Sequence, residues 1–370
     1  MLAERRPGTG ALPFSGSYLP DDVIFLLKPV RLAPTDVRDK EALIQSGRRH
    51  YSEMISEEQA PGADYLRLFE EALARNGARL AGDIASLAAH LAARSGGRQV
   101  VIASLARAGT PIGVLLLRTL RAGGCPAVHY SVSIIRDRGI DRNALAHIAA
   151  RHDPADVVFV DGWTGKGAIA GELRRSLTDR PFGFAPILAV VADPAGQADI
   201  AASPDDYLIA SGLLGGIVSG LVSRSIQSAE TVGPGDFHAC VTFPHLRDED
   251  ASRRFVDTVA PLAIGATARP IGRHATGRGR LARACEAMLA ELMERTGTTD
   301  RNRIKPGIAE ATRAFLRRVP NRLFLRDAGD PDLAHLLLLA RHAEVPVERL
   351  SGDCAYRAVA IIRQLGGGRA

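Results

Sequence analysis

The chain has 370 residues, of which 46% are hydrophobic and 24% are charged, and this composition excludes a fully disordered chain, a collagen-like chain and a coiled-coil rod. Its length predicts two or three domains. No apolar run reaches the ~18 residues of a membrane span, and we find no signal peptide. The four cysteines show neither a disulfide framework nor CxxC metal spacing. We therefore expect a cytoplasmic protein with no membrane contact.

The basic excess lies in the last part of the chain. Lys and Arg total 47 against 41 Asp and Glu, a net charge of +6. Residues 301–370 hold 13 basic and 7 acidic residues, which accounts for the whole excess. A basic segment attached to a balanced chain favours a module that faces a polyanion such as nucleic acid.

Helical and apolar segments alternate along most of the chain. Apolar residues recur at helical spacing over 64–93. Beyond this helix we expect strands at 99–104, 127–134, 155–160, 187–192 and 237–243, separated or followed by helices at 111–122, 142–151, 168–177 and 248–265. Continuous apolar strands separated by helices predict an α/β fold with a parallel sheet covered on both faces.

The C-terminal part shows a second, shorter pattern. Residues 266–280 are rich in Gly and Arg and predict a linker. The last 70 residues have a βαβ-like pattern with expected elements at 323–325, 331–343 and 345–347. We therefore divide the chain into three parts: a first domain with an N-terminal extension over 1–265, a linker and helix over 266–300, and a small α/β domain over 301–370.

Two junctions between a strand and a helix carry candidate site residues. Ligands of parallel sheets bind where strands end, because helix N-termini present free N–H groups there. After the strand at 99–104, Arg107 supplies a guanidinium, Gly109 allows close approach of the backbone, and Pro111 opens a helix. These residues form a candidate anion pocket. The alternative is an ordinary turn with a surface arginine.

The second junction follows the apolar strand at 155–160. Asp161 comes first, and a glycine-rich loop with a threonine and a lysine follows it: Gly162, Thr164, Gly165, Lys166 and Gly167. Such a loop can surround a phosphate with backbone N–H groups, while the hydroxyl and the ammonium add contacts. It is not a P-loop, because its first two glycines are too close together and a glycine stands where the Ser or Thr for magnesium would be.

Together the two junctions resemble a type I phosphoribosyltransferase, which has a Rossmann-like parallel sheet. The resemblance implies that phosphoribosyl pyrophosphate binds with Mg²⁺, and that Asp161 and Arg107 are the catalytic residues. Asp161 would hydrogen-bond the ribose hydroxyls, although the family usually has two adjacent acids there. The 5-phosphate would bind to Thr164–Gly167, and Gly162 would contribute to the same substrate-binding loop. The pyrophosphate would bind to the first loop, which comprises Ser104, Arg107, Ala108, Gly109 and Thr110.

Longer strings resemble one subfamily, the tellurite-resistance-associated phosphoribosyltransferase-like proteins, which are also labelled the cysteine protease StiP family. The resemblance covers roughly residues 15–245, and its strings lie at 18–23, 49–53, 104–111, 130–139 and 160–167. It implies transfer of ribose 5-phosphate to an unidentified acceptor in a stress-linked pathway for a nucleoside-like metabolite.

The family label implies a different activity, cysteine proteolysis. His238 and Cys240 lie two apart, so on a strand they share one face and could act as base and nucleophile. No third group that would orient the histidine is evident. The apolar run around Cys240 is typical of a buried, inert thiol. A protease that uses these two residues is the alternative to phosphoribosyl transfer.

The C-terminal domain contains a helix start that resembles the pelota and L7Ae-type RNA-binding fold. The matching residues are Lys305, Gly307, Glu310, Thr312 and Arg313. The resemblance implies contacts with an RNA backbone, to which two further arginines could contribute, Arg317 and Arg318. One alternative is a basic α/β cap that packs on the first domain. Another is a non-catalytic RNA-binding protein.

Overall fold

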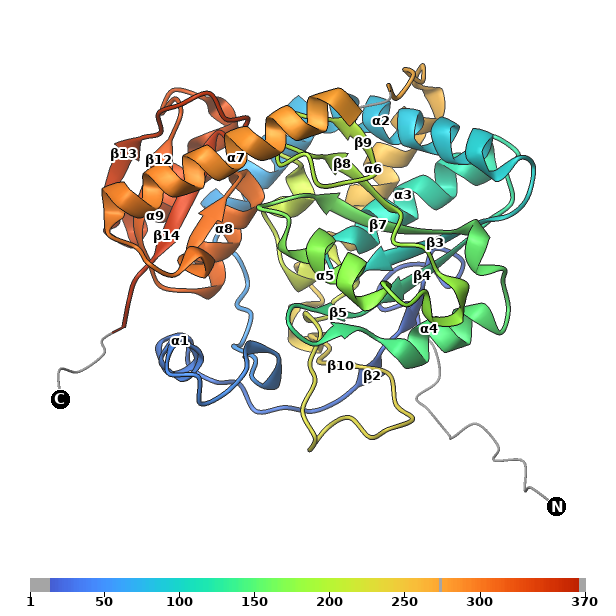
Figure 1. Ribbon diagram of the computed structural model, residues 1–370, viewed down its shortest axis with the longest axis horizontal. Helices are drawn as coiled ribbons and strands as arrows, with labels where there is room; N and C mark the ends of the chain where they lie inside the picture. The colour runs from blue at the N-terminus through green and yellow to red at the C-terminus, as the bar shows by residue number, and fades with distance from the viewer. Residues whose placement is uncertain (1–13, 273–274, 366–370) are drawn as a thin grey trace.

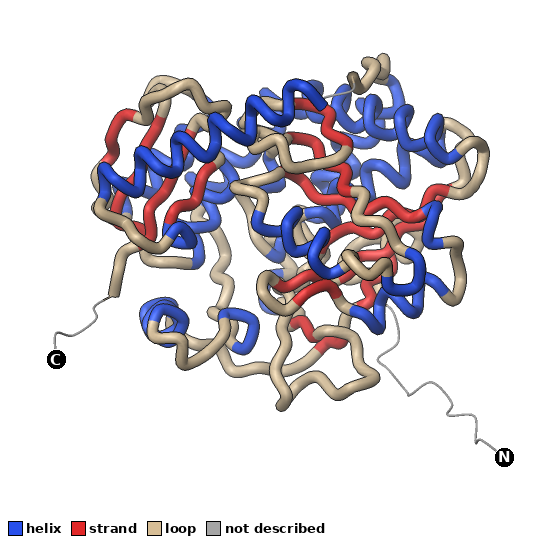
Figure 2. Tube along the Cα trace, in the orientation of Figure 1, coloured by secondary structure: helices blue, strands red, loops and turns tan. Residues whose placement is uncertain are grey.

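The computed structural model describes residues 14–272 and 275–365, and two β-sheets occupy separate parts of it (Figures 1 and 2). The larger sheet has six strands in the order β1-β4-β3-β7-β8-β9, and every neighbouring pair is parallel. The strands are β1 (Ile24–Leu26), β3 (Val100–Leu105), β4 (Ala127–Val132), β7 (Val157–Trp163), β8 (Leu188–Ala192) and β9 (Ile200–Ser203). The prediction of an α/β fold with a parallel sheet is confirmed.

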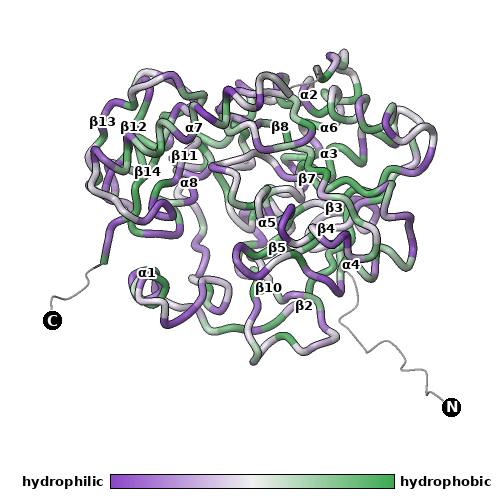
Figure 3. Tube along the Cα trace, in the orientation of Figure 1, coloured by the Kyte–Doolittle hydropathy of each residue, from purple (hydrophilic) through white to green (hydrophobic). Residues whose placement is uncertain are grey.

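Helices cover both faces of this sheet. One face carries α2 (Ala63–Ser95), α3 (Gly109–Ala122) and α6 (Ser252–Gly265), and the other carries α4 (Arg142–Ala149) and α5 (Ala168–Ser176). The central strands β3, β7 and β8 therefore bury side chains on both faces, which explains why they read as largely apolar runs (Figure 3).

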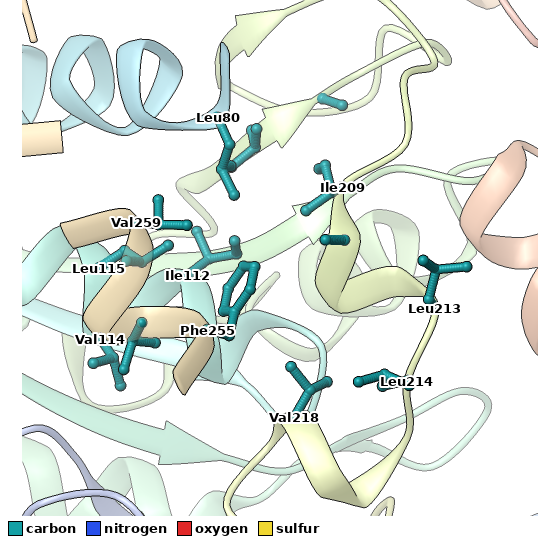
Figure 4. Close-up of a cluster of buried hydrophobic side chains, with 14 of the residues drawn as sticks. Leu80, Ile112, Val114, Leu115, Ile209, Leu213, Leu214, Val218, Phe255 and Val259 are labelled. Carbon is teal, nitrogen blue, oxygen red and sulfur yellow. The ribbon is translucent and has the colours of Figure 1, made fainter. Parts of the chain in front are cut away.

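Strand β3 shows how the two faces are separated. Ile102 belongs to the cluster that contains Leu115 and Phe255, whereas Val101 belongs to the opposite cluster with Leu173. Figure 4 shows the first cluster, where the side chains of α2, α3 and α6 converge. This packing fixes the carboxyl ends of the strands, from which the candidate loops emerge.

The C-terminal domain has its own core. Helix α7 (Ala275–Thr296) packs through Leu289 and Leu292 against Phe324 and Tyr356. The sheet order is β11-β14-β12-β13, in which β14 is antiparallel to both of its neighbours. The remaining elements are β11 (Ile304–Pro306), α8 (Ile308–Arg317), β12 (Pro320–Leu325), α9 (Ala334–His342), β13 (Val347–Arg349) and β14 (Ala358–Ile362). The expected small α/β domain is thus present.

Three expectations about individual segments need correction. The segment 237–243 forms only a two-residue strand, β10 (Ala239–Cys240), which pairs with β2 (Lys28–Pro29) outside the main sheet. The expected linker at 266–280 overlaps α7, which starts at Ala275; residues 273–274 lie outside the described residues. Strand β9 was not expected, because Ile-Ala-Ala-Ser at the sheet edge carries little apolar signal.

The N-terminal extension reaches the C-terminal domain. Helix α1 (Val37–Gln45) lies beside that domain in Figure 1, and its fully buried Glu41 accepts two hydrogen bonds from Arg318. These contacts join the N-terminal extension to the C-terminal domain. Within residues 14–272 and 275–365, none of the helices combines the length and apolar character that crossing a bilayer requires.

Candidate functional site

A cavity of about 600 Å³ lies where the loop after β7 meets the C-terminal domain and the N-terminal extension. Its lining is strongly basic. Ten basic side chains line it: Lys40, Arg49, Arg136, Lys166, Arg224, Arg303, Lys305, Arg313, Arg317 and Arg318. Five acidic side chains line it: Glu41, Asp137, Asp161, Asp300 and Glu310. A cavity with this excess of cations favours an anionic ligand.

The loop after β7 forms one wall. Gly167 has a φ of +83° at the start of α5, and a Cβ there would lie 2.7 Å from Gln197 Cγ, so the turn requires glycine. The Thr164 hydroxyl donates to Asp193 Oδ1 at 2.5 Å. Lys166 Nζ donates to the carbonyl oxygens of Arg301 and Ile304. The loop is therefore held from both domains.

Asp161 stands at the carboxyl end of β7 and lines the cavity. Its Oδ1 accepts a hydrogen bond from the Gly162 N–H at 2.8 Å. Burial raises the pKa of Asp161 to about 7, although Arg313 and the Gly162 N–H act in the opposite direction. A carboxyl group that titrates near neutrality is able to accept or hold a proton at physiological pH.

Helix α8 forms an adjoining wall. Glu310, Arg313 and Arg317 share one face of the helix, because they are three and four residues apart. Arg313 donates to Glu310 Oε1 at 2.8 Å, and its guanidinium carbon lies 4.7 Å from the ring centroid of Trp163. The predicted RNA-facing helix therefore faces the predicted phosphate loop.

Two lysines that line the cavity, Lys166 of the loop and Lys305 of β11, are close enough to affect pKa values. Burial lowers the pKa of Lys305 to about 7, and Lys166 lowers it further. Burial also lowers the pKa of Lys166 to about 8, with Arg136 and Arg301 acting in the same direction. An anion between the two lysines would stabilise their charged forms.

The structure brings together eight of the predicted site residues in this cavity. They are Asp161, Thr164, Gly165, Lys166, Gly167, Lys305, Glu310 and Arg313. The other predicted residues lie outside the described lining of the cavity: Ser104, Arg107, Ala108, Gly109, Thr110, Gly162, Gly307 and Thr312. Some of the residues predicted for a sugar-phosphate site and some of those predicted for an RNA site therefore line one cavity.

Several of the residues outside the lining have partners within the protein. The Ser104 hydroxyl lies 2.7 Å from His129 Nε2, and the Thr110 hydroxyl lies 2.8 Å from Ser131 Oγ. Gly109 packs against the backbone of β7, where a Cβ would lie 2.3 Å from the Val160 oxygen.

Arg107 and Thr312 are also engaged within the protein. Arg107 is buried, donates to the Val222 oxygen at 2.9 Å and pairs with Glu58. Thr312 is buried, and its hydroxyl donates to the Ile308 oxygen and lies 2.7 Å from His335 Nε2. Both side chains thus hold neighbouring segments in place in this structure.

The candidate thiol lies elsewhere. Cys240 is fully buried, and burial raises the pKa of its thiol to about 12. His238 Nδ1 lies 2.7 Å from Ser133 Oγ, which is its partner in the structure. The described lining of the cavity contains none of the four cysteines.

Sequence reasoning did not find Arg224, Glu58 or Lys40, and it placed Arg317 only at an RNA surface. Each of the first three lies in a segment without a recognisable motif, and the fold alone brings them to the cavity or to its edge. Arg317 did carry a signal, because its spacing from Glu310 and Arg313 places all three on one helix face.

The fold and the site define a two-domain α/β protein with a basic cavity between its domains. The family described as tellurite-like stress resistance cysteine protease StiP matches residues 16–260, and the PELOTA RNA binding domain matches residues 283–364. The "Cysteine protease StiP" of Acinetobacter baylyi is 44% identical over an alignment of 367 residues, and the match covers 96% of each chain. The chain belongs to the StiP family.

Solved structures with related architecture are hypoxanthine phosphoribosyltransferases. The Trypanosoma cruzi enzyme in complex with the product IMP is 15% identical with a TM-score of 0.28, and the match covers 45% of this chain and 91% of that one. A 1.4 Å structure of the enzyme from the same organism is 16% identical with a TM-score of 0.27, covering 34% and 75%. Similarity at this level carries no argument about chemistry.

Proposed function

We propose that the cavity binds phosphoribosyl pyrophosphate and that the protein transfers ribose 5-phosphate to an acceptor. One observation carries the proposal: Asp161 and the lysine-containing loop at 162–167 lie together at the end of a parallel strand, in a cavity with ten basic and five acidic side chains. The loop would hold the 5-phosphate through its N–H groups and Lys166. Asp161 would hydrogen-bond the ribose hydroxyls.

The reaction would break the bond between C1 of the ribose and the pyrophosphate oxygen. The bonding electrons leave with pyrophosphate, a lone pair of the acceptor forms the new bond to C1, and the acceptor loses a proton. Negative charge grows on pyrophosphate while positive charge grows on the ribose. Basic side chains fixed around the cavity would stabilise the leaving group. The sequence-based role of Arg107 in this step stays a prediction.

Magnesium is part of the same proposal. Within the described residues, no group of three His, Cys, Asp or Glu side chains is placed to hold a metal ion. Mg²⁺ in phosphate chemistry is bound mainly by substrate oxygens, with one or two carboxylates and several waters. Asp161 is a carboxylate in the cavity that fits this requirement. Bound to pyrophosphate, Mg²⁺ would neutralise charge on the leaving group.

The direct test is pyrophosphate release in the presence of phosphoribosyl pyrophosphate, Mg²⁺ and candidate acceptors. Asp161→Ala should abolish release. Asp179→Ala, which removes an exposed carboxylate outside the cavity, should leave the rate unchanged. Equal rates in the wild type and Asp161→Ala would contradict the proposed role.

The printed name of the 44% identical relative supports a second candidate, cysteine proteolysis. In this chain the thiol of Cys240 would have to become accessible and ionised, because burial raises its pKa to about 12. The geometry therefore favours phosphoribosyl transfer. Activity that is lost on alkylation of Cys240 alone would favour the protease.

The PELOTA match supports RNA as a further partner. Lys305 and Arg313 face the cavity, so an RNA that uses them would have to enter it. Binding of short RNA to the full chain, with an affinity that falls steeply with salt and is lost in Lys305→Ala, would support this partner. Equal binding by the wild type and the variant would assign the RNA to another surface.

A further inference from the structure

Arg107 and Arg317 pair with a single carboxylate at the edge of the cavity, that of Glu58, and a third arginine, Arg224, is close enough to influence both arginines electrostatically. Glu58 pairs with Arg107, lies 3.9 Å from Arg317 and accepts a hydrogen bond from the Gly216 N–H at 2.7 Å. Burial opposes ionisation of Glu58, but Arg107 and Arg317 outweigh it and hold its pKa at about 2. The single negative charge of Glu58 is thus accompanied by three positive charges. The third belongs to Arg224, which lowers the pKa of Arg317.

Of these three arginines, the two that line the cavity, Arg224 and Arg317, are not neutralised. Arg224 donates to three carbonyl oxygens, those of Tyr51, Met54 and Ser225, which occupy three of its five N–H groups without cancelling its charge. Arg317 has no hydrogen-bond acceptor among the described residues, and Glu58 at 3.9 Å is already engaged by Arg107.

Burial and mutual repulsion act on both groups. Burial lowers the pKa of Arg317 to about 9, and Arg107 lowers it further. Burial also lowers the pKa of Arg224 to about 10, with Arg107 again contributing. Guanidinium groups present five N–H donors in a planar fork that suits phosphate oxygens. An anion at this position would remove the repulsion and fill the free donors.

We propose that Arg224 and Arg317 form a second phosphate-binding site in the cavity, one that exists only where the two domains meet. Arg224 comes from the first domain and Arg317 from α8 of the C-terminal domain. The inference rests on the proposed function, which supplies the class of ligand. That ligand would carry two separated phosphate groups, one bound by the loop at 162–167 and the other bound by Arg224 and Arg317. The second group is either the leaving pyrophosphate or a phosphate of the acceptor.

Calorimetric titration of the full chain with inorganic pyrophosphate and with inorganic phosphate tests this site. The wild type should bind pyrophosphate in the presence of Mg²⁺, and Arg317→Gln should weaken binding at least tenfold. Arg341→Gln, which neutralises an exposed arginine on α9 outside the cavity, should bind as the wild type does. Tighter binding of pyrophosphate than of phosphate assigns the site to the leaving group; equal binding assigns it to an acceptor phosphate.

Two further measurements keep the test decisive. Arg317→Lys retains the charge without the fork, so it should bind pyrophosphate more weakly than the wild type, and this comparison holds even if the glutamine variant unfolds. Ribose 5-phosphate should bind Arg317→Gln as it binds the wild type, and Lys166→Ala more weakly.

Two results would overturn the inference: no pyrophosphate binding by the wild type, or equal binding by the wild type and both Arg317 variants. The inference and the proposed function can fail separately. Pyrophosphate binding that depends on Arg317, without turnover of phosphoribosyl pyrophosphate, would retain the site and reject the reaction.

Discussion

Glu310 of the C-terminal domain packs directly on Gly165 of the loop after β7, where a Cβ on the glycine would lie 2.9 Å from Glu310 Cγ. The Tyr356 hydroxyl donates to the Gly165 oxygen at 2.8 Å from the same domain. The loop is therefore shaped on both sides by a domain that joins it from more than 130 residues away in the chain. This contact makes the cavity a property of the whole chain.

The contact predicts the effect of Gly165→Ala. The added methyl group has to displace Glu310, which in turn moves its partner Arg313. We expect ribose 5-phosphate to bind about threefold more weakly or worse. We also expect the overpacked methyl group to lower the free energy of unfolding by about 1 kcal/mol. Calorimetry and urea unfolding measure the two effects. Gly235→Ala, at a loop glycine outside the cavity that has no atom within 4 Å of the added Cβ and, like Gly165, no positive φ, is the matched control. Unchanged affinity in Gly165→Ala would show that the packing is not needed.

Asp161 should impose a pH dependence on stability. Its folded-state pKa of about 7 lies above the unfolded value of about 3.9, so the unfolded chain binds fewer protons between these values. The contribution of Asp161 to stability therefore falls as the pH rises from about 4 to about 7. We expect Asp161→Asn to be more stable than the wild type at pH 8, by on the order of 2 kcal/mol, and the difference to vanish near pH 4. Urea unfolding across this range measures it; a constant difference would refute the raised pKa.

Asp206 should be important for the domain interface. It is buried and accepts hydrogen bonds from the Ile308 N–H at the start of α8 and from the Arg357 N–H at 2.8 Å. Asp206→Ala leaves both donors without a partner, so we expect a loss of about 2 kcal/mol. Asp206→Asn retains one acceptor oxygen and should lose less. Thermal and urea unfolding compare the variants, and an alanine variant as stable as the wild type would contradict this interface.

Alkylation discriminates the two chemical hypotheses. Cys240 is fully buried with a thiol pKa of about 12, so iodoacetamide at pH 8 should leave it unmodified in the folded protein. Cys125, which is partly exposed, should react first. Peptide mass spectrometry after brief labelling identifies the modified thiol. Rapid labelling of Cys240, together with loss of activity, would support the protease.

Much of the first domain could be predicted from local pattern. The strand expected at 187–192 and the helix expected at 168–177 differ from the observed elements by one residue at one end each. Apolar runs and helical spacing are enough to predict such elements, because the apolar residues that form each pattern are the ones that the fold buries. The strand expected at 237–243 was wrong, because an apolar run does not show what will cover it: its residues are buried by loops and not by the main sheet.

The cavity could be predicted only in part. Asp161 and the loop that follows it carry a local motif at the end of a strand, and Asp161 and Thr164–Gly167 do line the cavity. The cluster of Glu58, Arg224 and Arg317 brings together residues that are far apart in the sequence, so no local sequence pattern predicts it. The sequence also could not show that α8 turns its basic face toward the first domain, since that depends on how the two domains pack.

The most direct test of the account is calorimetric titration of phosphoribosyl pyrophosphate with Mg²⁺ into the wild type and into an Asp161→Ala, Lys166→Ala variant. The account predicts saturable binding by the wild type that the double variant loses, while circular dichroism shows that both are folded. Absence of binding by the wild type, or equal binding by the two proteins, would contradict the placement of a sugar-phosphate site at Asp161 and the loop that follows it.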